Sequence, residues 1–208
     1  MKLGRRLLLL VAFMGLAAAA ALSIDRVVQP HATSELLLAA GMGVAVALPG
    51  LVHRRFAPTT LLLLPLGLYL LMRLVVPLPP DSAGWHEQYR FYANELNSGI
   101  SAYANDIFPL SLTGVPGLRL LVLVWFYLGV GLAAFLSLDG RRPLPGVGVL
   151  LALLAAGLTV DAERRDPLLA VAFLVLAITV VMTAQSLSRR SWGFRDALTG
   201  LRDGGRGG

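Results

Sequence analysis

Six long apolar runs constrain the fold more than any other feature of this sequence. They lie at about residues 7–24, 34–52, 59–76, 118–138, 144–160 and 168–185. A helix needs about 20 apolar residues to cross a bilayer, and lipid offers the backbone of an open sheet no hydrogen-bond partners. Only 14% of the residues are charged, whereas a soluble domain has roughly 25%. We therefore predict an all-α polytopic membrane protein, with a six-span membrane domain at 1–190 and a basic, Gly-rich cytoplasmic tail at 191–208.

The first run also has features of a secretory signal. Basic residues precede it at Lys2, Arg5 and Arg6, and small residues fill its second half. The apolar core of a signal peptide is typically about 7 to 15 residues long, and this run is longer. We therefore predict a retained first span, with a cleaved signal as the alternative.

The third and fourth runs are separated by a long polar segment. Its apolar residues recur at steps of three and four, which predicts a helix at about 83–108 with one apolar stripe. The stripe consists of Trp85, Tyr89, Tyr92, Leu96, Ile100, Tyr103 and Ile107. The other face is polar and includes Glu95, so we expect an amphipathic helix lying along a membrane surface. Because Asn97, Ser98 and Gly99 are weak helix formers, a bend or break is predicted there.

The basic residues predict the orientation of the spans. Of the eighteen, twelve fall on the side of the N-terminus and six on the other side, which also holds nine of the twelve acids. The positive-inside rule places both termini in the cytoplasm and the 83–108 helix outside. Seventeen of the eighteen are arginines, a bias typical of GC-rich coding, so we expect a bacterial plasma membrane protein.

Two arginines bracket the polar segment, at the predicted outer ends of the third and fourth spans. Arg73 and Arg119 can each reach the interface with a long side chain and need no partner there. Alternatively, both contact lipid phosphate or acids of the outer helix, such as Glu95 or Asp106, and hold that helix down. The aromatic rings of the outer helix favour a membrane interface. The candidate interface or lipid-contact residues are therefore Arg73, Arg119, Trp85, Tyr89, Tyr92 and Tyr103.

We find no pattern that predicts catalysis. The chain has no cysteine and no nucleotide-binding, nucleophile-elbow or zinc motif. Two histidines and two acids on the outer side lack the spacing of a metal site, and four loop acids are read as a solvated face; these residues are His31, His86, Glu35, Asp81, Glu87, Glu95 and Asp106. We predict no enzyme activity, cofactor, metal, nucleic acid or small-molecule substrate. Membrane lipids and other envelope membrane proteins are the expected partners.

The order of elements resembles a known family. Three spans precede an outer helix with Gly99, Tyr103 and Pro109; a fourth span follows, then DGRRPLPG at 139–146, two further spans and RRSWG at 189–193. This pattern is similar to the N-terminal membrane domain of bacterial transglutaminase-like proteins of the TgpA type. In that family a further span leads to an extracytoplasmic domain with a Cys, His and Asp triad. This sequence has no Cys, so no catalytic residue of the family can be assigned to it.

Two functions remain open at this stage. The first is a non-catalytic membrane module that anchors or organises an envelope-associated, transglutaminase-like protein or complex. The second is a small transporter or lipid-handling protein, which would need a polar path between spans or broken spans in an internal repeat. The middle third of each predicted span contains no ionisable residue, which disfavours ion-coupled transport. We favour the first function, whether the chain is complete or a fragment of a longer protein.

Overall fold

The computed structural model describes residues 2–52, 57–78, 84–105, 110–111, 116–139, 143–160 and 167–203. Within these ranges the chain is almost entirely helical, which confirms the predicted all-α class. The helices are α1 (Lys2–Asp25), α2 (Thr33–Val52), α3 (Ala57–Val75), α4 (Trp85–Asn105), α5 (Pro116–Ala134), α6 (Pro143–Val160) and α7 (Pro167–Asp203).

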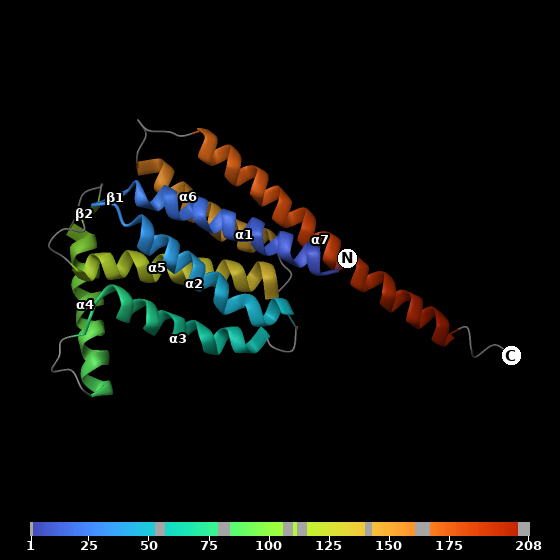
Figure 1. The fold of residues 1–208 in the computed structure, drawn as a ribbon, viewed down its shortest axis with the longest axis horizontal. Helices are drawn as coiled ribbons and strands as arrows, with labels where there is room; N and C mark the ends of the chain where they lie inside the picture. Colours follow the sequence, from blue (N-terminus) through green and yellow to red (C-terminus); the bar gives the residue numbers. More distant parts are fainter. Residues whose placement is uncertain are drawn as a thin grey trace.

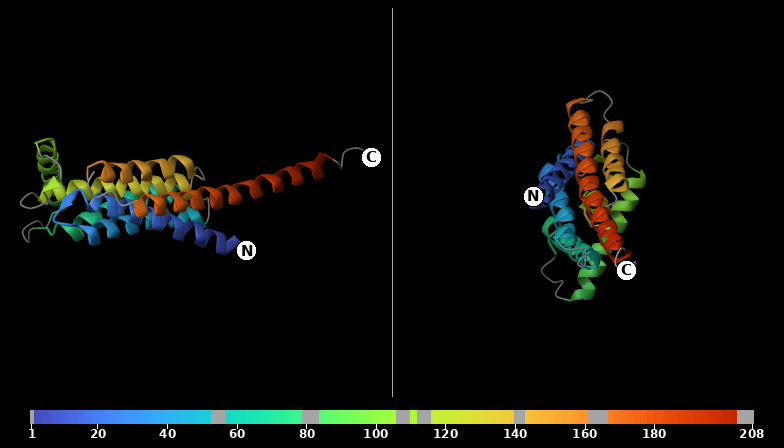
Figure 2. Two further views of the ribbon diagram at one scale, coloured as in Figure 1. Left: turned by 90° about the horizontal axis from the view of Figure 1, so that it is seen from above. Right: turned by 90° about the vertical axis from the view of Figure 1, so that its right-hand side faces the viewer.

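Six of these helices run side by side along one axis, and the seventh does not. Figure 1 shows α4 lying across one end of the bundle formed by α1, α2, α3, α5, α6 and α7. The N- and C-termini both lie toward the opposite end, where α7 extends beyond the other helices (Figures 1 and 2). We refer to the two ends as the α4 end and the terminal end.

Three prolines and one backbone cap mark where four of the helices begin. Pro116, Pro143 and Pro167 are each the first residue of a helix, a position where the missing N–H is not needed and the fixed φ suits the first turn. At the start of α4, the Gly84 carbonyl accepts hydrogen bonds from the N–H groups of Glu87 and Gln88. These local signals explain why the helices begin close to the first residue of each apolar run.

The apolar helices differ in length. Three stretches are long and apolar enough to cross a membrane: Gly4–Asp25, Pro116–Leu138 and Pro167–Ser186. The apolar stretches Thr33–Pro49, Leu62–Val75 and Pro143–Leu158 are shorter, although α2, α3 and α6 themselves have 20, 19 and 18 residues. The structure thus establishes three candidate spans by length and composition.

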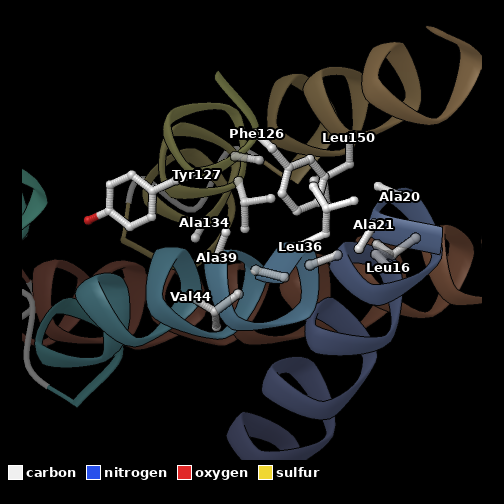
Figure 3. Packing of buried hydrophobic residues seen from close by; sticks show 14 of the residues in the cluster. Leu16, Ala20, Ala21, Leu36, Ala39, Val44, Phe126, Tyr127, Ala134 and Leu150 are labelled. Atoms are coloured by element: carbon white, nitrogen blue, oxygen red, sulfur yellow. The ribbon is translucent and has the colours of Figure 1, made fainter. Parts of the chain in front are cut away.

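Large apolar side chains fill the centre of the bundle. Figure 3 shows Leu16, Leu36, Phe126 and Leu150, from four different helices, meeting in the interior. Tyr127 is the largest side chain that is fully buried, and its hydroxyl donates a hydrogen bond to the carbonyl of Leu64 over 2.8 Å. The core is therefore built around the middle of α5.

Small residues allow α2 and α5 to approach closely. Ala39 and Ala47 of α2 are fully buried, and a Cβ added at Gly43 would lie 3.2 Å from the backbone nitrogen of Gly131. On α5, Ala133 and Ala134 are also fully buried. The small residues of α2 and α5 therefore form a packing face between these two helices.

The structure contains three features that the sequence did not predict. Two two-residue strands, β1 (Val28–Gln29) and β2 (Leu110–Ser111), pair in parallel. The last turn of the α5 segment is a π-helix, η2 (Phe135–Asp139). Finally, α7 continues as a helix to Asp203, so that most of the predicted tail at 191–208 is helical. Residues 204–208 lie outside the described part of the chain.

Candidate functional site at the α4 end

The α4 helix packs on the bundle with a side that differs from its apolar stripe. Its buried or half-buried residues are Gln88, Phe91, Tyr92, Glu95, Leu96, Gly99 and Ala102. Of the predicted stripe only Tyr92 and Leu96 belong to this set; at about 100° per residue, the packed side is rotated by roughly 80° from the stripe. The expectation that Glu95 lies on the face opposite the contact is therefore wrong, because Glu95 is half-buried on the side facing α5.

Backbone contact between two glycines determines this rotation. A Cβ added at Gly99 would overlap the carbonyl oxygen of Gly117 at the start of α5, and one added at Gly117 would overlap the carbonyl oxygen of Glu95. Only residues without a side chain permit such an approach. The helix α4 is continuous through Gly99, so the predicted break there is wrong. The glycine serves the close crossing instead.

Tyr92 is the main side chain that anchors α4. It is 3% exposed, packs with Val76, Leu120 and Val124, and its hydroxyl donates to the carbonyl of Val76 over 3.2 Å. Burial raises the pKa of Tyr92 above its usual value, the nearby Tyr69 adds to this rise and the positive charge of Arg73 opposes it. The phenol therefore stays protonated at neutral pH and remains a donor.

The other aromatic residues of the predicted stripe lie at the surface. Trp85 is 72% exposed and Tyr89 67% exposed, and Ile100 and Tyr103 are also exposed. The Trp85 ring lies against Tyr69 of α3, with centroids 5.5 Å apart and a tilted geometry. The α4 helix thus has three sides: a packed side, an exposed aromatic side, and an exposed polar side that includes His86, Arg90, Asn94, Asn97 and Ser101.

The two candidate arginines have different surroundings. Arg119, in the first turn of α5, donates from Nε to Glu35 Oε2 over 2.7 Å and pairs through Nη2 with Glu35 Oε1. Its partner is thus an acid of α2 and not one of α4. Glu35 lies in the first turn of α2, where a negative charge is favourable, and Arg119 lies in the first turn of α5, where a positive charge is unfavourable. The ion pair offsets the unfavourable charge of Arg119. Arg73, in the last turn of α3, is exposed. Asp81 and Asp106, two other acids near these arginines in sequence, lie outside the described residues.

Asp25 organises the connection between α1 and α2 at the same end. Its carboxylate accepts hydrogen bonds from the Ala32 N–H over 2.7 Å and from the Thr33 hydroxyl over 2.6 Å. His31 lies beside it, with Nδ1 3.4 Å from Oδ2. The strand β1 in this connection pairs with β2, which lies between α4 and α5. The α1–α2 connection and the α4–α5 connection are therefore tied together.

The pairing of Glu35 with Arg119 and the position of Gly117 were not predicted from the sequence. A signal for the first existed, because opposite charges begin two apolar runs on the same predicted side. No signal existed for the second, because a glycine contributes no side chain to an apolar pattern.

These contacts hold α4 across the end of the bundle and leave its aromatic and polar sides exposed. Within the described residues, no group of three or more His, Cys, Asp or Glu side chains is placed to hold a metal ion. Comparison of the chain with protein-family models, with curated proteins and with solved structures finds no match.

Proposed function

We propose that this protein is a non-catalytic module of a bacterial plasma membrane that presents α4 on the outer surface as a docking platform for a transglutaminase-like envelope protein. The observation that carries the proposal is the position of α4, held across the bundle end by Gly99, Gly117 and Tyr92 with its polar side exposed. A platform needs such a rigid element, because a mobile one loses binding energy to ordering.

We further propose that all six bundle helices cross the membrane, including the three with shorter apolar stretches. At about 1.5 Å per residue the 18 residues of α6, the shortest of the six bundle helices, extend for about 27 Å, close to the thickness of the hydrocarbon core. Both termini lie at the end opposite α4 (Figure 1). In our proposal the terminal end is cytoplasmic, in accord with the excess of basic residues on that side. The exposed apolar residues along the bundle then face lipid.

The first test concerns topology. Because the chain has no cysteine, a single introduced cysteine is a unique target. We expect an impermeant maleimide to label Asn94→Cys in intact cells, and to label Ser191→Cys only after the membrane is permeabilised. Labelling of Ser191→Cys but not of Asn94→Cys in intact cells would show the reverse orientation.

The second test concerns docking. A photo-crosslinking residue at Asn94 or Ser101, on the polar side of α4, is expected to capture one protein that contains a transglutaminase-like domain, identified by mass spectrometry. The matched control places the same residue at Tyr89, on the aromatic side, where we expect lipid and no protein crosslink. Capture of the same protein from Tyr89, or of none from Asn94 and Ser101, would contradict the proposal.

A further inference from the structure

The corner where α3 meets α4 contains a cation that is not neutralised by the described part of the chain. Arg119 has its charge balanced by Glu35, whereas Arg73 makes no ion pair with any residue in the described ranges. Arg73 is exposed and lies one turn after Tyr69 on α3. Of the two arginines that bracket α4, Arg73 is therefore the one whose charge is not balanced by a carboxylate of the described residues.

Aromatic and polar side chains surround this corner. The Tyr69 ring contacts the Trp85 ring, and the Tyr69 hydroxyl donates to Gln88 Oε1 over 2.9 Å. The positive charge of Arg73 also opposes the rise in the pKa of Tyr92. Tyr and Trp prefer the level of lipid headgroups, where one end of the ring is apolar and the other wet.

An apolar surface leads away from the corner along α3. Leu62 and Leu66 fall on the same helical face as Tyr69 and Arg73, at intervals of four, three and four residues. Both leucines are well exposed, at 75% and 53%. From Leu62 to Arg73 the helix rises by about 16 Å, so the surface combines one cation, two rings and an apolar strip in that order.

We propose that this corner binds one anionic glycerophospholipid, with its phosphate on the Arg73 guanidinium and an acyl chain along Leu66 and Leu62. The fork of Arg suits a phosphate, which it binds through two parallel N–H donors. The proposal rests on the membrane placement given above, and it adds a specific lipid site to it. The simple alternative is that the Arg73 side chain only extends into water, where its positive charge stabilises the C-terminal end of α3 through the helix dipole.

The test uses Trp85 as a reporter inside the site. Phe replaces Trp125 and Trp192 in the full chain, which leaves Trp85 as its single tryptophan. The purified protein in detergent is titrated with phosphatidylglycerol carrying brominated acyl chains, which quench nearby indole fluorescence. We expect saturable quenching by this lipid and at least tenfold weaker binding of phosphatidylcholine with the same brominated chains. Arg73→Gln should weaken phosphatidylglycerol binding by tenfold or more, because about 1.5 kcal/mol or more is lost with a charged hydrogen bond.

Arg90→Gln is the matched control, because it removes the same charge from the polar side of α4. We expect it to bind phosphatidylglycerol as the parent protein does, and Arg73→Lys to bind better than Arg73→Gln. Equal quenching by the two lipids, an unchanged Arg73→Gln or an equal loss in Arg90→Gln would overturn the lipid site. This readout in detergent does not depend on orientation in cells, so a failed cysteine-labelling test would be distinguished from a failed lipid test.

Discussion

Alanine at Gly99 or at Gly117 is expected to lower the free energy of unfolding by about 2–3 kcal/mol, at the upper end of the range for overpacking. In each case the new Cβ would overlap a backbone carbonyl of the opposing helix, which cannot move aside as a flexible side chain can. We therefore expect α4 to separate from α5. Thermal unfolding in detergent gives the loss of stability, and faster maleimide labelling of a cysteine at the half-buried position Leu96 reports the detachment of α4.

Two other helical glycines provide the matched control. A Cβ at Gly41 of α2 or at Gly148 of α6 meets no atom within 4 Å. Because alanine is the better helix former, Gly41→Ala and Gly148→Ala should stabilise the protein by up to about 1 kcal/mol. All four substitutions are glycine to alanine. A loss of stability therefore reports the close contact of α4 with α5, and a gain reports the higher helix propensity of alanine. A similar change in stability for all four would show that the α4–α5 crossing is not a close contact.

Truncation of Tyr127 to alanine is expected to cost about 3–5 kcal/mol, as for other buried aromatic residues. The side chain is fully buried between α5, α3 and α2, and its hydroxyl lies against Gly67 and donates to the Leu64 carbonyl. Removal of the ring would leave a cavity at the centre of the bundle. Tyr127→Phe removes only the hydrogen bond and should cost about 1 kcal/mol. Chemical or thermal unfolding of the three proteins measures this order.

Trp125 is the control for this substitution, because it is a large aromatic residue two positions earlier on the same helix. It is 68% exposed, so Trp125→Ala should change the stability by less than about 1 kcal/mol. A loss in Trp125→Ala as large as that in Tyr127→Ala would mean that the exposed side of α5 is covered by a contact absent from this single chain.

The sequence predicted the helices well because each depends on a local pattern. Each predicted span rests on one apolar run of about 20 residues, so no distant residue is needed to recognise it. The helix at 83–108 was predicted for the same reason, and α4 spans Trp85–Asn105 within it. Residue 83 and residues 106–108 lie outside the described part.

The orientation of α4 was not predictable in this way. An apolar stripe shows which side chains avoid water, but here both the bundle and a membrane surface can satisfy them. The Gly99–Gly117 contact decides between these surfaces, and it involves two residues that add nothing to the stripe. For the same reason the prediction treated Gly99 as a weakness of the helix, and the partner of Arg119 was missed because Glu35 is 84 residues away.

The separation between Glu35 and Arg119 also bears on how the protein is made. A ribosome that adds about 5–20 residues per second needs roughly 4–17 seconds to proceed from one to the other. During this interval the carboxylate of Glu35 has no access to Arg119, and the nascent α1–α2 hairpin depends on Asp25, Ala32 and Thr33 to hold its corner. The contacts at this corner join residues no more than eight positions apart and can form as soon as α2 is made, whereas the contact with α5 has to come later.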